Sequence, residues 1–318
     1  MNKTHEFGIV GLGRMGSNLA LQALEKGLRV VGYRAKGAPE ELVRAGLVEI
    51  REFERFRDRL GRPRVVLIYI PAGPAVDRVL AELTPHLEPG DVVADGGNSY
   101  WRDTVQRHRR LLEAGIHFVD LGTSGGVPGA RRGAAFMAGG AREAVAPIEP
   151  ILRRLAAEGG YVHAGPAGAG HFAKLVQNGI AYGMFQAVAE GVELLERFDG
   201  GLDVAGILDG WRGGAVVRSW ILDKLADAYR SEGGTAHVPP YVEDTGEVNW
   251  LVNDALEMDV AAPVISQALL QVIASRDEQK RAARVVAMLR RGIGGHPYGR
   301  DDESAERRRR SRSESCPP

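Results

Sequence analysis

Short apolar runs alternate with longer helical patterns through the first half of the chain. The runs are rich in β-branched residues and are bounded by turn-forming residues, which is typical of buried strands. Strands that alternate with helices in this way form parallel sheets covered by helices on both faces. The first half is therefore predicted to be an α/β domain with a doubly wound sheet, whose strands are Phe7 to Val10, Val30 to Tyr33, Val65 to Ile70, Val92 to Ala94 and Phe118 to Leu121.

The strand pattern ends at a glycine-rich stretch, residues 165–170, and helical periodicity follows it. Apolar residues recur at helical spacing over three stretches, His171 to Phe198, Ala215 to Tyr229 and Ala262 to Arg290. We therefore expect two domains, an α/β domain over residues 1–164 and an all-α domain over residues 165–299. Residues 300–318 combine acidic residues with a run of arginines, and this composition predicts a disordered charged tail to which no function is assigned.

Composition excludes several classes of function. The 41 Lys and Arg residues balance the 41 Asp and Glu residues, so no global field attracts the chain to nucleic acid or to an anionic membrane surface. No apolar stretch reaches the ~18 residues that a membrane-spanning helix needs. The single cysteine, Cys316, leaves no partner for an internal disulfide, and the first residues lack the pattern of a signal peptide. We expect a cytoplasmic protein.

A glycine motif directly follows the first predicted strand and opens a helix. Such a turn lets the backbone approach a pyrophosphate, while the free N–H groups of the helix N-terminus face the anion. The context of strand, turn and helix is the one that a dinucleotide fingerprint requires, so the sequence predicts a Rossmann-type nucleotide site. The motif consists of Gly11, Leu12, Gly13, Arg14, Met15 and Gly16.

The residue after the second predicted strand bears on the choice of cofactor. Proteins that bind NAD usually carry an acid there for the ribose 2′-hydroxyl, whereas this chain has Arg34, with Lys36 close by. Cationic side chains can pair with the 2′-phosphate of NADP, so NADP is favoured over NAD. The alternative is that both are solvated loop charges.

Further motifs, in a fixed order, cover nearly the whole chain before the tail. They are Asp95–Ser99, Gly122–Arg131, Gly168–Ile180, Trp211–Gly214, Val216–Ser219 and Gly294–His296. Together they resemble the 6-phosphogluconate dehydrogenases, in their shorter bacterial form, within the β-hydroxyacid dehydrogenase superfamily. The resemblance implies oxidative decarboxylation of 6-phosphogluconate to ribulose 5-phosphate and CO2 with reduction of NADP or NAD. It also implies roles in the pentose phosphate pathway and gluconate utilization, and a homodimer or homotetramer.

The chemistry predicts a base for this reaction. Oxidation of a secondary alcohol needs a group that takes the hydroxyl proton, and a lysine in a partly dry crevice can have the lowered pKa that this role requires. Lys174 is the candidate, and Asn178 and Tyr182 share its helical face at four and eight positions along. The alternative for a lysine on a helix is a solvated surface charge.

Other residues are candidates for substrate binding. Backbone N–H groups and the hydroxyl of the turn Ser124, Gly125 and Gly126 can hold the substrate carboxylate, although the glycines could serve the turn alone. The resemblance implies that Asn98 contacts both substrate and cofactor. It also implies a phosphate grip in which C-terminal residues reach in from a neighbouring subunit, made by Arg218, Arg290 and His296.

Three positions depart from the family pattern. The acid expected one turn beyond Asn178 is Ala181, a family histidine is replaced by Gln177, and an expected basic residue is Asn249. Gln177 and Tyr182 remain candidates for substrate contact. Without the acid, protonation of C1 after decarboxylation would fall to water or to a side chain such as Tyr182.

The departures keep two other functions open. One is a dehydrogenase of another 3-hydroxy acid, which would use Lys174 and Asn178 without the missing acid. The other is a non-catalytic relative that binds the nucleotide. No motif with the spacing of metal ligands appears in the sequence, so no metal is expected.

Overall fold

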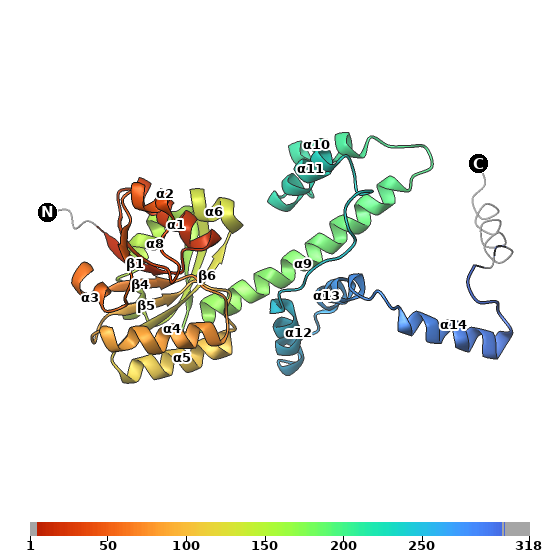
Figure 1. Ribbon diagram of the computed structural model, residues 1–318. Coiled ribbons are helices and arrows are strands. Elements are labelled where there is room, and N and C mark those ends of the chain that lie inside the picture. Colours follow the sequence, from red (N-terminus) through yellow and green to blue (C-terminus); the bar gives the residue numbers. More distant parts are fainter. Residues whose placement is uncertain (1–4, 301, 303–318) are drawn as a thin grey trace. The chain divides into compact units, whose positions relative to one another are not determined.

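The computed structural model describes residues 5–300 and 302 (Figure 1). They fall into two compact units. The first unit comprises the residues up to Asp227 together with Thr245–Leu269. The second comprises Ala228–Asp244 and the residues from Leu270 onward. The predicted charged tail lies outside the described residues, apart from 300 and 302.

One sheet organises the first unit. Its eight strands, among the described residues, run in the order β3-β2-β1-β4-β5-β6-β7-β8. All pairs are parallel except β6 with β7, so the predicted parallel sheet is confirmed for the five predicted strands, and the antiparallel pair involves a strand that was not predicted. The strands are β1 Glu6–Val10, β2 Arg29–Tyr33, β3 Val48–Ile50, β4 Val65–Ile68, β5 Val92–Asp95, β6 His117–Ser124, β7 Ala134–Gly139 and β8 Ala156–Gly165.

The three strands that the pattern did not predict have a weak apolar signal. β3 is three residues long with Glu49 at its centre, and β7 is half alanine. β8 lies at the edge of the sheet and has no buried residue, with glycines and polar residues along it. Their pairing with neighbouring strands, rather than local hydrophobicity, makes them strands.

Alternate residues of the central strands enter two separate cores. Phe7 and Ile9 of β1 point into one core, and Val10 points into the other. Because successive side chains of a strand face opposite sides, both faces of the sheet are buried, which is the doubly wound arrangement that was predicted. Helices α1, α6 and α8 cover one face, while α4 and α5 cover the other (Figure 1). The helices of this part are α1 Arg14–Glu25, α2 Glu40–Arg44, α3 Arg55–Arg59, α4 Pro74–Leu83, α5 Trp101–Glu113, α6 Gly126–Arg132, α7 Arg142–Val145 and α8 Glu149–Leu155, with a 3-10 turn at Thr84–His86.

Helices alone follow β8 within the part of the chain that the structure describes. The predicted helix over 171–198 is present, whereas the predicted helix over 262–290 is two helices, separated where Lys280 takes a left-handed conformation with φ 47°. α10 and α12 were not predicted. The predicted domain limits of 1–164 and 165–299 remain predictions. The helices are α9 Ala169–Glu196, α10 Val204–Gly214, α11 Trp220–Glu232, α12 Glu247–Glu257, α13 Pro263–Ser275 and α14 Arg281–Gly294.

Candidate active site

A cavity of about 780 Å³ lies at the carboxyl ends of the central parallel strands. This is the edge at which open α/β sheets bind ligands. The glycine motif and α9 face the same cavity, although they are far apart in the sequence. Seven of the predicted site residues line it, namely Gly13, Arg14, Met15, Asn98, Gly126, Lys174 and Asn178.

The glycine motif has the geometry that its chemistry requires. Gly11 has a φ of +96°, and a Cβ there would lie 2.3 Å from the carbonyl oxygen of Tyr69. A Cβ on Gly16 would lie 2.0 Å from the carbonyl oxygen of Gly11, so neither position accepts a side chain. Gly13, at the start of α1, has open space around its Cβ position. The backbone of this turn is therefore free to approach a ligand in the cavity.

Lys174 of α9 lies within a group of neutral hydrogen-bond acceptors. Its Nζ donates to Oε1 of Gln177 at 2.6 Å and to Oγ of Ser124 at 3.5 Å. Burial lowers the pKa of Lys174, and the negative charge of Glu247 partly opposes this effect. A lysine with a lowered pKa is more readily neutral, and only the neutral amine can take a proton.

A line of polar side chains crosses the cavity beside Lys174. The side-chain amide of Asn178 donates to Oδ1 of Asn98 at 3.5 Å, and Nδ2 of Asn98 donates to Oε1 of Glu247 at 2.5 Å. Thr245 and Trp250 line the same region. The sequence analysis assigned no role to these two residues or to Glu247. The sequence signal for this region is Gly246 followed by Glu247 at the start of a helix. Because many ordinary helices begin with a glycine and an acid, this signal does not indicate a functional site.

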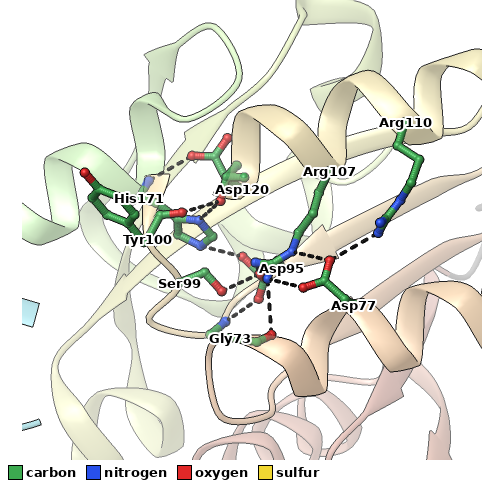
Figure 2. Close-up of polar contacts among 11 residues, drawn as sticks. Gly73, Asp77, Asp95, Ser99, Tyr100, Arg107, Arg110, Asp120 and His171 are labelled. Carbon is green, nitrogen blue, oxygen red and sulfur yellow. Dashed lines mark hydrogen bonds and ion pairs between the residues drawn. The ribbon is translucent and has the colours of Figure 1, made fainter. Parts of the chain in front are cut away.

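Buried charges hold the two loops that frame the cavity (Figure 2). Asp95 ends β5 and accepts hydrogen bonds from Ser99 Oγ at 2.7 Å and from the Gly97 backbone at 3.0 Å. Arg107 is 3% exposed, donates to the carbonyl oxygen of Gly73, and pairs with Asp77 at 2.8 Å. That pairing keeps the pKa of the Asp77 carboxyl below its usual range.

The start of α9 is anchored in the same way. Asp120 of β6 is fully buried and accepts hydrogen bonds from the backbone N–H groups of Gly168, at 2.7 Å, and His171, at 2.8 Å. The ring of His171 contacts the Thr104 hydroxyl at 2.7 Å and the Asp95 carbonyl oxygen at 3.0 Å (Figure 2). These contacts determine where the first turns of α9, and hence Lys174, lie above the sheet.

Several predicted site residues do not line the cavity. Arg34 and Lys36 lie in the turn after β2, and Arg218 is exposed between α10 and α11. Tyr182 lies further along α9, where its ring is 6.3 Å from that of Phe185. Leu12 is buried in the core, so it can contribute only its backbone, and Gly125 lies in the turn before α6. Arg290 and His296 are exposed residues of the second unit.

Comparison with known proteins decides the family. A model of the NAD binding domain of 6-phosphogluconate dehydrogenase matches residues 6–165, and a model of the C-terminal domain of 6-phosphogluconate dehydrogenase matches residues 170–308. The chain belongs to the 6-phosphogluconate dehydrogenase family. The resemblance and the fold class inferred from the sequence are thereby confirmed.

The chain is similar both to relatives of nearly its own length and to longer relatives. YqeC of Bacillus subtilis, provisionally named a 6-phosphogluconate dehydrogenase, is 38% identical over 92% of this chain and 98% of its own length. An NAD(+)-dependent, decarboxylating 6-phosphogluconate dehydrogenase of Haloferax volcanii is 36% identical over 94% of this chain and 100% of its own length. The NADP(+)-dependent enzyme of Bacillus subtilis is 33% identical, and the match covers 64% of that longer protein.

Solved structures agree with this assignment. The 6-phosphogluconate dehydrogenase of Plasmodium falciparum, solved without ligand, with its cofactor NADP+ and with its substrate 6-phosphogluconate, superposes with a TM-score of 0.80. It is 26% identical, and the match covers 93% of this chain and 66% of that one. A 3-hydroxyisobutyrate dehydrogenase of Salmonella typhimurium, at 20% identity and a TM-score of 0.70, shares the fold. Family members are oxidoreductases that use NAD or NADP.

The described part of the chain offers neither a membrane-spanning helix nor a cluster of metal ligands. No helix there is both long enough and apolar enough to span a bilayer. No group of three or more His, Cys, Asp or Glu residues there is arranged to hold a metal ion.

Proposed function

We propose that the protein oxidises and decarboxylates 6-phosphogluconate to ribulose 5-phosphate and CO2 with reduction of NADP or NAD. The observation that carries the proposal is the position of Lys174, which lies half-buried in the same cavity as the open glycine turn at Gly13. The proposed base and the proposed dinucleotide-binding turn thus line the same cavity. The family assignment supplies the substrate class.

The residues present fit a dinucleotide. The open backbone at Gly13 and the free N–H groups at the start of α1 would hold the pyrophosphate, with Arg14 and Met15 beside it. Arg34 and Lys36, after β2, favour NADP by pairing with its 2′-phosphate. The bound dinucleotide supplies a hydride acceptor for C3 of the substrate.

The side chains of this chain would handle the protons and the substrate charges. Neutral Lys174 takes the C3 hydroxyl proton and returns it to the same oxygen as CO2 leaves, since the electrons of the broken C–C bond flow toward that carbonyl. Ser124, which Lys174 contacts, and the turn at Gly125 and Gly126 hold the substrate carboxylate. Asn98 and Asn178 orient the sugar hydroxyls.

The phosphate end of the substrate needs cations from elsewhere in the assembly. We assign Arg218, Arg290 and His296 to this grip, with C-terminal residues supplied by a neighbouring subunit of a homodimer or homotetramer. Exposure of these side chains in a single chain supports that assignment. The proposed setting is the cytoplasm, in the pentose phosphate pathway and gluconate utilization.

A matrix of substrates and cofactors tests the function. Pure protein is mixed with 6-phosphogluconate and NADP or NAD, and both NAD(P)H appearance and CO2 release are followed. We expect both products, with NADP used better than NAD. Absence of both with either cofactor at high enzyme concentration would refute the proposal, and NADP binding without reduction of any hydroxy acid would identify a non-catalytic relative.

A second candidate is a dehydrogenase of another 3-hydroxy acid. The observation that favours it is the carboxylate of Glu247, which lines the cavity. The acid and the basic residue expected from the family are replaced by Ala181 and Asn249. A negative charge in the cavity opposes a multiply charged substrate more than a singly charged one. Faster turnover of 3-hydroxyisobutyrate than of 6-phosphogluconate would establish this alternative.

A further inference from the structure

The proposed reaction needs an acid that the sequence pattern does not provide. Loss of CO2 leaves an enediol, and ribulose 5-phosphate forms only when C1 of that enediol receives a proton. Position 181 of α9, two turns beyond Lys174, carries alanine. Alanine has no proton to give, so another group in the cavity must serve or the step is left to water.

Glu247 is a carboxylic acid in the same cavity as Lys174 and Asn178. One of its oxygens accepts the 2.5 Å hydrogen bond from Asn98, and the other accepts a hydrogen bond from Thr245. Its charge acts directly on Lys174, where it opposes the lowering of the lysine pKa by burial. The carboxylate is therefore within electrostatic reach of the base.

The position of Glu247 is not explained by helix capping. α12 begins after Gly246, whose left-handed backbone serves as the N-cap without any side-chain hydrogen bond. The Glu247 carboxylate instead reaches Asn98, a residue 149 positions away in the sequence. A first-turn acid that serves only its own helix would face the N–H groups of that helix.

Two contacts hold α12 in place. Asp254, 1% exposed and two turns after Glu247 on the same helical face, accepts hydrogen bonds from Tyr100 at 2.6 Å and from Trp101 at 2.8 Å. Leu251 packs against Gly179 of α9, where a Cβ would lie only 2.3 Å from its Cδ2 atom. The glycine next to Asn178 thus lets α12 approach α9 closely. Glu247, one turn before Leu251, is held over the cavity as a result.

We propose that Glu247 is the acid that protonates C1 of the enediol, in place of the acid missing at position 181. The inference rests on the proposed function. The carboxyl proton of Glu247 moves to C1 while the C1=C2 electron pair forms the new C–H bond. Neutral Lys174 takes the proton of the C2 hydroxyl as the C2 ketone forms. Glu247 is then a carboxylate and Lys174 an ammonium, which is the state in which the charge of Glu247 raises the lysine pKa. Transfer of one proton from Lys174 to Glu247 gives the neutral base and the carboxylic acid with which each turnover begins.

Glu247 fits this role better than the residue that the sequence suggested. Tyr182 does not line the cavity, and its ring packs with Phe185 further along α9. Glu247 lines the cavity from α12, so the proton donor and the base come from different helices. The family pattern places both the base and the acid on α9. In this chain the base stays on α9, and the acid comes from α12.

The stereochemistry of the product tests the proposal. The reaction is run in D2O, and NMR determines which of the two C1 positions of ribulose 5-phosphate carries deuterium. An acid fixed in the site delivers deuterium to one face, whereas solvent delivers it to both. Wild-type protein is compared with Glu247→Gln, with Glu247→Ala as a second acid-free variant, and with Ala181→Glu in the Glu247→Gln background. Glu257→Gln is the matched control, because Glu257 lies on the same helix and pairs with Arg102.

We expect wild-type protein and Glu257→Gln to label one C1 position at the same rate. Glu247→Gln should label both positions and turn over ~10²-fold more slowly, while the first-turnover burst of NADPH stays within ~3-fold of wild type, since hydride transfer precedes this step. Ala181→Glu should restore labelling of one position. Circular dichroism checks that each variant is folded.

Two results would overturn the proposal and leave the proposed function intact. Labelling of a single position at unchanged turnover in a folded acid-free variant shows that Glu247 is not the donor. A burst that falls as much as turnover shows that Glu247 acts before CO2 leaves. A wild-type protein that forms no NADPH from 6-phosphogluconate overturns the proposed function, and this inference with it.

Discussion

The close contact between α9 and α12 should govern stability at Gly179. A Cβ at this position would lie 2.3 Å from Cδ2 of Leu251 and 3.2 Å from Cγ2 of Ile265, well inside ordinary van der Waals contact. Over-packing of this kind costs ~1–3 kcal/mol, while replacement of glycine by alanine inside a helix gains up to ~1 kcal/mol. The Gly179→Ala variant should therefore lose ~0–3 kcal/mol of unfolding free energy.

Gly191 provides a control on the same helix. No atom lies within 4 Å of its Cβ position, so Gly191→Ala should show the helical gain alone, up to ~1 kcal/mol. The two variants should then differ by ~1–3 kcal/mol in urea unfolding. Because the contact also places Glu247, Gly179→Ala should slow 6-phosphogluconate turnover while NADP affinity is unchanged.

A double-variant cycle isolates the contact. Leu251 is 7% exposed, and Leu251→Ala alone should cost ~2–5 kcal/mol. In the Leu251→Ala background the added methyl of Gly179→Ala has room, so the two effects should fall short of additivity by ~1–2 kcal/mol. Equal stability of Gly179→Ala and Gly191→Ala, with an additive cycle, would show that α12 does not pack on α9 in this way.

Three further predictions concern the site. Lys174→Ala should reduce the rate of single-turnover hydride transfer, measured by stopped flow, by ~10²-fold or more. NADP binding, measured by calorimetry, should be retained. A variant that remains active would show that Lys174 is not the base. Arg34→Asp should weaken NADP by ~10-fold to 100-fold and spare NAD, and an unchanged NADP dissociation constant would refute the pairing with the 2′-phosphate. Burial lowers the pKa of Lys174, and the charge of Glu247 raises it. Because the neutral base exists above that pKa, Glu247→Gln should move the acidic limb of the hydride-transfer pH profile to lower pH. A limb that stays in place or moves to higher pH would contradict this coupling.

Local sequence signals predicted the elements that their own residues stabilise. The strand over 65–68 and the long helix that carries Lys174 were found because each has the apolar pattern of a buried element. The half-exposed β8 and the 11-residue α10 were missed, since pairing and packing with distant residues stabilise them. The break at Lys280 was missed for a related reason, because a continuous apolar pattern does not show where a helix ends.

The sequence by itself determined the glycine turn that we propose for the cofactor, and it indicated Lys174 as the proposed base. Gly11 and Gly16 are required by their own local geometry. Lys174 follows a glycine-rich entry to its helix, and the resemblance of the surrounding motif to the family, together with this entry, indicated it as the base. Only the tertiary structure decided that Glu247 faces the same cavity. Its contact with Asn98 depends on how α12 packs on α9, and packing between residues that are far apart in the chain leaves no periodic signal in the sequence.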